Sequence, residues 1–247
     1  MAVLWDLMNC DGKLADDEVH VWHFSLRLPE RTFDRLLEHL DEEEKERASR
    51  FKFPAPRNQF VASHAFLRTV LGSYLKVEPR GLRFHNSPHG KPELITNDLR
   101  FNLSHTAGAA VVAVTRRRAV GIDVERVREN LKPLELAERF FSHTETDWLR
   151  GQPESQRFSA FFACWTAKEA YIKACGGGLS IPLAGFGVIP HRGQADLRLE
   201  VYGDPVESER WSMWQLQLEP DLPSALAVEG KPPMVRVGQI FELETKV

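Results

Sequence analysis

Apolar positions recur along the chain at two periods, which predict two kinds of element. Apolar residues three or four positions apart share one face of a helix, whereas alternation is typical of strands. Helices are expected over 41–51, 57–76, 134–140 and 155–176, with a further one opening at 142–148. Strands are expected over 19–28, 99–105, 109–115, 119–125, 185–189, 196–202, 211–219 and 225–229.

The order of the expected elements repeats along the chain. In each half a short helix ending in Arg-Phe, at 50–51 and at 139–140, precedes a longer amphipathic helix, and strands follow. This repetition predicts an α+β fold of two similar halves. We place them at 1–117 and 118–247, the second carrying a C-terminal extension.

Composition excludes several classes of protein. The 247 residues are 43% hydrophobic, enough to bury roughly 70–75% of the unfolded surface. A net charge of −3 provides no general attraction to nucleic acid or anionic membrane. The three cysteines form no CxxC pair, so we expect neither a disulfide framework nor a zinc knuckle. With no signal peptide or membrane-spanning run expected, a cytoplasmic location is predicted.

One carboxylate interrupts the apolar face of the helix expected over 155–176. Glu169 falls among apolar residues on that face, which are Phe158, Phe161, Phe162, Trp165 and Ile172. A charged carboxylate there costs several kcal/mol unless it is paired or bound to a metal. An exposed pair with Lys173, one turn on, returns only about 0.3–0.5 kcal/mol. Glu169 therefore lies either at the edge of the apolar face or in a metal site.

A second acidic feature is the strand GIDVE (121–125). Alternation places Asp123 and Glu125 on one side, where like charges repel. Either this side is solvated, or it binds a hard cation such as Mg²⁺ or Mn²⁺, which prefers oxygen ligands and substrate phosphates. If Glu169 faces the same point, three carboxylates meet one ion.

The role of several basic residues has two possible interpretations. Lys168 and Lys173 flank the Glu169 face, where they would suit a polyphosphate or be solvated flanks. Lys91 in the turn HGKP, His105 at a strand end and Arg68 at a helix edge could each contact a phosphate or be structural.

Three motifs, taken together, resemble the Sfp-type 4′-phosphopantetheinyl transferases. They are FNLSHT (101–106), GIDVE (121–125) and WTAKEAYIKACGGGLS (165–180), in this order and at this spacing. The chain matches every fixed position of the family pattern, and ERASRF (46–51), LRTVLG (67–72) and GKP (90–92) also fit. The resemblance covers about residues 20–230. GIDVE or HGKP alone is weak evidence, whereas the ordered set is highly specific.

The resemblance implies a pseudo-twofold arrangement of the halves, with coenzyme A bound in the cleft between them. It implies Mg²⁺, or alternatively Mn²⁺, held by Asp123, Glu125 and Glu169. Arg68 would approach the 3′-phosphate of coenzyme A. The full set of implied coenzyme A contacts is Arg47, Arg68, Lys91, Pro92, Ser104, His105, Asp123 and Lys173. The family often has a lysine in the region where this chain has Glu44.

The implied reaction transfers 4′-phosphopantetheine from coenzyme A to a serine of an apo acyl or peptidyl carrier protein, releasing adenosine 3′,5′-bisphosphate. Its catalytic residues would be Glu169, Lys173 and His105, the last two at the pyrophosphate. Glu169 is the expected general base, directly or through water, with a water held by the metal as the alternative acceptor.

The expected partner is an acidic carrier domain of fatty acid, polyketide, nonribosomal peptide or lysine metabolism. The run Arg116–Arg118 is either a docking point or a solvated turn, and the segment 176–183 is a second candidate docking point. We expect a monomer that binds neither nucleic acid nor membrane. Two other functions stay open: a Mg²⁺-dependent phosphohydrolase of coenzyme A or nucleotides, and a non-catalytic module that binds coenzyme A or an acidic partner.

Overall fold

The computed structural model describes residues 13–95, 98–189 and 195–240. Its larger strands form two sheets, and β2 (Phe84–Asn86) and β3 (Pro92–Leu94) form a separate hairpin. The first sheet has the order β11 (Met234–Ile240), β1 (Glu18–Ser25), β5 (Ala109–Arg116), β4 (Leu99–Thr106). The second has the order β6 (Val120–Val124), β10 (Leu222–Glu229), β9 (Trp211–Glu219), β8 (Asp196–Val201), β7 (Phe186–Ile189).

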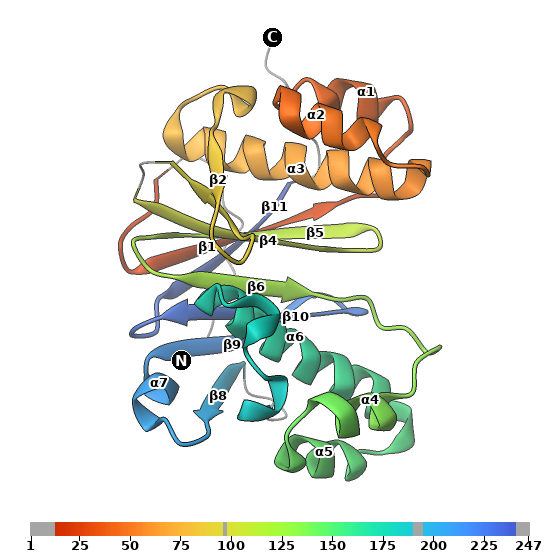
Figure 1. Cartoon of the computed structure of the whole chain (residues 1–247), viewed down its shortest axis with the longest axis vertical. Coiled ribbons are helices and arrows are strands. Elements are labelled where there is room, and N and C mark those ends of the chain that lie inside the picture. Colours follow the sequence, from red (N-terminus) through yellow and green to blue (C-terminus); the bar gives the residue numbers. More distant parts are fainter. Residues whose placement is uncertain (1–12, 96–97, 190–194, 241–247) are drawn as a thin grey trace.

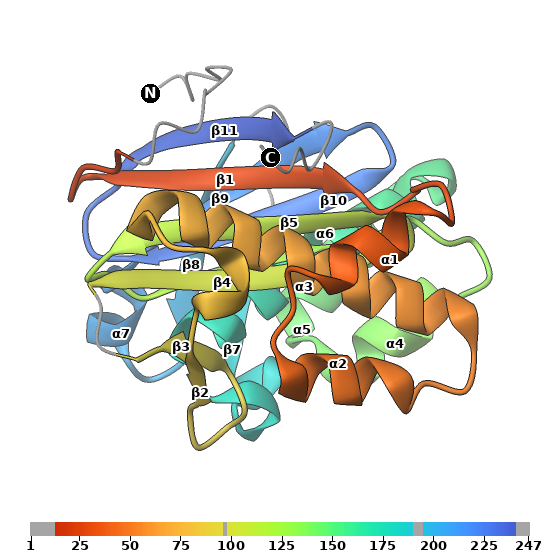
Figure 2. The ribbon, with the colours of Figure 1, turned by 90° about the horizontal axis from the view of Figure 1, so that it is seen from above.

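Helices cover the outer faces of the two sheets, which face each other in the middle of the molecule (Figure 1). From above, α3 lies across the first sheet (Figure 2). The first half contains α1 (Thr32–Leu37), α2 (Glu42–Ser49) and α3 (Pro54–Leu75). The second contains α4 (Pro133–Phe140), α5 (His143–Arg150), α6 (Arg157–Cys175) and α7 (Pro205–Glu209). The structure confirms the α+β class and the short-then-long order of helices in each half.

Alternation along β5 shows how the sequence builds these layers. Ala110, Val112 and Val114 pack in the core beneath α3. The intervening residues pack in the core between the two sheets, and they are Ala109, Val111 and Ala113. Both faces are apolar because β5 is covered on both sides.

The close approach of α6 to β6 depends on one glycine. A Cβ added to Gly121 would lie 2.1 Å from the carbonyl oxygen of Ala170 and 2.3 Å from the nitrogen of Ala174. Any side chain at position 121 would therefore push the helix away. This approach brings the last turns of α6 directly over β6.

The predicted elements are confirmed with end shifts of a few residues. Among the α-helices and strands of the described residues, α1, β2, β3, α7 and β11 were not predicted. β11 runs parallel to β1, so this C-terminal strand belongs to the first sheet. In the described part of the chain, no helix is long and apolar enough to cross a membrane.

Candidate active site

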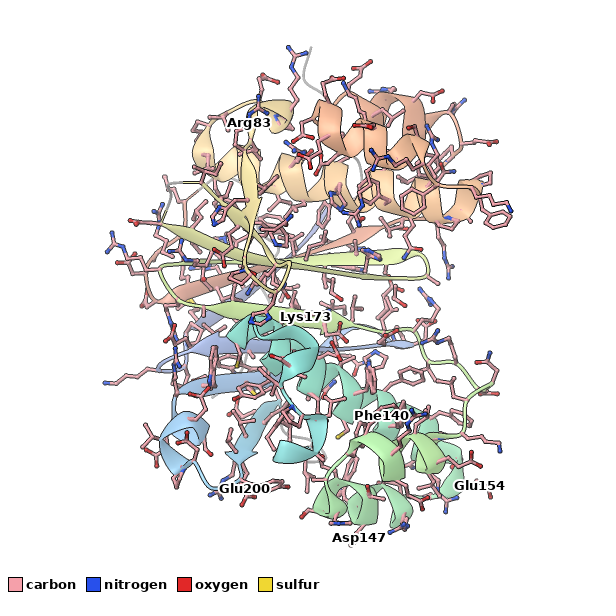
Figure 3. All side chains as sticks on the ribbon, viewed as in Figure 1. Arg83, Phe140, Asp147, Glu154, Lys173 and Glu200 are labelled. Atoms are coloured by element: carbon pink, nitrogen blue, oxygen red, sulfur yellow. The ribbon has the colours of Figure 1, made fainter. Side chains whose placement is uncertain are left out.

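The motif residues meet where α6 crosses β6. The Lys173 ammonium donates to Asp123 Oδ1 at 2.5 Å and to Ser104 Oγ at 3.0 Å. The Ser104 hydroxyl also donates to Asp123 Oδ1, at 2.8 Å. Figure 3 labels Lys173 at this junction between the two halves. Residues from β4, β6 and α6, far apart in the sequence, are therefore brought together.

The second carboxylate oxygen of Asp123 is also buried. Asp123 is only 4% exposed, and its Oδ2 is buried without a hydrogen bond among the described residues. A buried acceptor left unsatisfied costs about 1–3 kcal/mol, and more when charged. A carboxylate oxygen held in this way is an open position for a cation.

The carboxylates of Glu125 and Glu169 are affected by the negative charges near them. Burial raises the pKa of Glu169, and the charges of Asp123 and Glu125 raise it further, against the opposing effect of Lys173. Burial and Asp123 likewise raise the pKa of Glu125. These shifts show that the three acids interact and that a further positive charge would be favourable here.

The three acids do not form a ready ligand set. Within the described ranges, no three His, Cys, Asp or Glu side chains are gathered closely enough to hold a metal ion. Glu125 accepts a hydrogen bond from Thr106 and lies 3.6 Å from Arg128. The all-oxygen donor set and the open Asp123 Oδ2 nevertheless suit a hard divalent cation.

His105 lies at the exposed end of β4, where its ring is held by Gln59 from α3. Gln59 Nε2 lies 2.9 Å from His105 Nδ1 and 3.1 Å from the Thr106 carbonyl oxygen. Because the carbonyl can only accept, the amide nitrogen must be the atom facing both groups, so Nδ1 accepts and Nε2 carries the proton of the neutral ring. Desolvation lowers the pKa of His105, and His64 and Lys173 lower it further. No sequence pattern indicated Gln59.

Lys91 ties β6 to the end of α6. Its ammonium donates to the carbonyl oxygens of Val120 at 2.9 Å and Lys173 at 2.7 Å. Burial lowers the pKa of Lys91 to about 8. Lys91 and Pro92 line a cavity that also contacts Gly176 at the end of α6. Lys91 thus lies beside the site with its ammonium already bound to backbone.

Arg68 is not brought into this group. It is fully buried, donates from Nε to Glu44 Oε2 at 2.5 Å, and binds Asp41 and two backbone carbonyls. Glu44 also lies 2.8 Å from His64 Nδ1. Arg47 is exposed, with its guanidinium 4.9 Å from the centre of the Phe60 ring. Of the two arginines, Arg47 has the accessible charge.

Lys168 differs from both sequence-based readings, because it neither faces a phosphate nor lies in solvent. It is fully buried, and its ammonium donates to both Glu145 oxygens at 2.7 and 2.6 Å and to the Phe186 carbonyl at 2.7 Å. Glu145 in turn forms the capping box of α5 with Ser142. Lys168 therefore connects α6 to α5 and β7.

The basic run expected to help docking is largely bound within the chain. Arg116 donates to the Leu14 carbonyl at 2.7 Å, and Arg117 binds Asp98. Arg118 donates to the Glu229 carbonyl at 2.6 Å. These bonds fix the turn between β5 and β6.

The sequence matches known families of transferases over most of its length. Residues 28–117 match the model described as 4′-phosphopantetheinyl transferase, N-terminal, and residues 119–227 match the 4′-phosphopantetheinyl transferase superfamily. The chain is 42% identical over 171 residues to the 4′-phosphopantetheinyl transferase HetI of Nostoc sp., covering 68% of this chain and 72% of that protein.

The chain is also similar to a second 4′-phosphopantetheinyl transferase. The 4′-phosphopantetheinyl transferase Sfp of Bacillus subtilis is 31% identical over 170 residues, covering 67% of this chain and 74% of that protein. A solved holo-(acyl-carrier-protein) synthase of Thermotoga maritima aligns with 46% of this chain and 63% of its own, at 25% identity and a TM-score of 0.36, a partial likeness from which nothing is inferred. The chain belongs to the 4′-phosphopantetheinyl transferase superfamily.

Proposed function

We propose that the protein transfers 4′-phosphopantetheine from coenzyme A to a serine of an apo acyl or peptidyl carrier protein, releasing adenosine 3′,5′-bisphosphate. Family membership supports the reaction class. The main observation that supports the site is Asp123 Oδ2, which is buried without a hydrogen bond among the described residues. Asp123 pairs with Lys173 where the two halves meet.

The proposed metal is Mg²⁺, with Mn²⁺ able to replace it, held by Asp123, Glu125 and Glu169. Their oxygen donors and the raised pKa values of both glutamates support this choice, because a cation relieves the mutual repulsion. When bound, the ion supplies positive charge against the pyrophosphate of coenzyme A.

Lys173 and His105 are proposed to hold the pyrophosphate. Lys173 carries a positive charge close to the acids, and charge-assisted bonds from such a group stabilise developing negative charge. With Nδ1 held by Gln59, His105 presents Nε2–H as its donor. Arg47, Lys91, Pro92 and Ser104 complete the coenzyme A contacts, and Arg68 contributes by fixing α2 against α3.

Glu169 is proposed to accept the serine proton, directly or through water. Glu169 would hold the cation with one oxygen and accept the proton with the other, and a water held by the metal is the alternative acceptor. The serine oxygen then forms the new bond to the phosphorus of phosphopantetheine. The bond from that phosphorus to the bridging oxygen breaks, and the adenosine bisphosphate leaves with the electron pair.

The halves 1–117 and 118–247 are proposed as the two structural units, and the protein is proposed to act as a cytoplasmic monomer. Ser104 from one half and Asp123 from the other already meet within one chain, which supports a site that needs no second copy. Carriers of fatty acid, polyketide or nonribosomal peptide synthesis are the proposed partners.

The test is to incubate the protein with coenzyme A, Mg²⁺ and an apo carrier protein and to weigh the carrier by mass spectrometry. A gain of one phosphopantetheine is expected. Cleavage of coenzyme A without carrier modification would instead indicate the hydrolase, and neither change would indicate a binding module.

Glu169→Gln is expected to lower turnover about 10²–10⁴-fold, because it removes the proposed base and one anionic ligand. Coenzyme A binding, measured by calorimetry without metal, should persist. Glu154→Gln makes the same exchange at an exposed residue and should retain full activity. Normal turnover by Glu169→Gln would contradict both roles of Glu169.

A further inference from the structure

The strands β4 and β6 lie next to each other at the join between the two sheets (Figure 1). β4 pairs with β5 and β6 pairs with β10. Between these two strands, both described throughout, there is no main-chain ladder. The edge of β6 therefore needs other partners for its buried N–H groups.

Side chains of β4 provide those partners. Asn102 Oδ1 accepts from the Ile122 nitrogen at 2.8 Å, and Ser104 Oγ accepts from the Val124 nitrogen at 3.4 Å. Thr106 Oγ1 accepts from the Arg126 nitrogen, just beyond β6, at 3.3 Å. We call Asn102, Ser104 and Thr106 the side-chain ladder.

The ladder follows from strand geometry. Its members are alternate residues, so they share one face of β4, while Phe101 on the opposite face packs beneath α3. Each contact spans 20 residues, because position 102 meets 122, 104 meets 124 and 106 meets 126. A constant difference means that the strands run in the same direction and that slippage would break every contact at once.

The ladder also reaches the acidic site. Ser104 donates to Asp123, and Thr106 donates from Oγ1 to Glu125 Oε2 at 3.3 Å. A threonine hydroxyl has one proton and two lone pairs. Thr106 can therefore accept from the Arg126 backbone and donate to Glu125 together, which links the position of the strand to the position of the carboxylate.

Glu125 has a second, longer contact. Arg128 lies 3.6 Å from the same oxygen, beyond hydrogen-bond range, and its side chain is 55% exposed. Thr106 is the closer and better-shielded partner of the carboxylate.

We propose that Thr106 is a positioning residue, which holds the Glu125 carboxylate toward the divalent cation through its place in the side-chain ladder. The proposal rests on the proposed metal site, in which Glu125 is a ligand. Partners that orient a ligand in this way typically change metal affinity by about 10–100-fold when removed.

The test compares Thr106→Val with Thr106→Ser. Mn²⁺ binding to the full-length protein is measured by electron paramagnetic resonance with coenzyme A and without a carrier, so that no turnover is needed. Thr106→Val keeps the shape and loses the hydroxyl, and its Mn²⁺ dissociation constant should rise about 10-fold. Thr106→Ser keeps the hydroxyl and should restore near-normal affinity.

Thr69→Val is the matched control, because it removes a half-buried hydroxyl of α3 that is bonded to His39. It should leave Mn²⁺ binding unchanged. Amide exchange supplies a second readout, since the Arg126 N–H should exchange faster in Thr106→Val and not in Thr106→Ser. If Thr106→Val does not fold, Thr106→Ala takes its place with the same expectations.

Two results would overturn the positioning role while leaving the metal site intact. They are wild-type Mn²⁺ affinity in Thr106→Val, or equal losses in the valine and serine variants. If the wild-type protein itself binds no Mn²⁺, the proposed metal site and the role of Thr106 both fail.

Discussion

At the scale of residues, the site is a balance of charge around Asp123. One of its oxygens accepts hydrogen bonds from Lys173 and Ser104. The other is buried and has no hydrogen bond among the described residues. Burial and the charge of Asp123 raise the pKa of both Glu125 and Glu169, and the charge of Glu125 raises that of Glu169 further. A bound cation would relieve this repulsion between the carboxylates.

The pH dependence of stability should reveal the buried Lys91. Its pKa falls from 10.5 unfolded to about 8 folded, so between these pH values the unfolded chain keeps a proton that the folded protein has released. Stability due to Lys91 should therefore rise with pH from about 8 to 10.5, by up to about 3 kcal/mol. Urea unfolding at several pH values measures the difference in the free energy of unfolding between wild type and Lys91→Met. A difference that does not change with pH would contradict the expectation.

Residues whose role depends on local pattern were predictable, and those that depend on tertiary partners were not. Glu169 was singled out because it interrupts the apolar face of its helix, and Asp123 because alternation places it beside Glu125 on one side of its strand. Lys168 could not be placed, because its partner Glu145 comes from another helix. No sequence pattern indicated the contact of Gln59 with His105, since only the fold brings the two residues together.

At the scale of elements, the candidate site depends on how closely α6 approaches β6. Gly121 permits the contact, Lys91 bonds to the backbone of both elements, and the side-chain ladder fixes β6 against β4. The GIDVE motif thus combines a packing residue with two acids. The periodicity of the sequence predicted both elements but could not specify the distance between them.

Gly121→Ala should separate α6 from β6. Its new Cβ would meet backbone atoms at 2.1 and 2.3 Å, which no side-chain rotation can relieve. We expect a loss of about 3 kcal/mol or more in the free energy of unfolding, with reduced turnover. Chemical denaturation measures the loss.

Gly81→Ala is the control for this substitution, because no atom lies within 4 Å of its added Cβ. It should be neutral or stabilise by up to about 1 kcal/mol. Equal stabilities of the two variants would contradict the packing role of Gly121.

At the scale of the whole molecule, two sheet-and-helix halves meet so that each contributes to one site. The repeated order of helices predicted the halves from the sequence alone. The placement of β11 was not predicted, because alternation can indicate a strand but not which sheet edge it joins. Its parallel pairing with β1 returns the end of the chain to the first sheet.

Anomalous scattering from a crystal grown with coenzyme A and Mn²⁺ tests most directly whether Asp123, Glu125 and Glu169 hold the cation. We expect one strong peak, from an ion bonded at roughly 2–2.5 Å to Asp123 Oδ2 and to one oxygen each of Glu125 and Glu169. A peak elsewhere, or an Asp123 Oδ2 that still lacks a partner in the presence of both ligands, would contradict it.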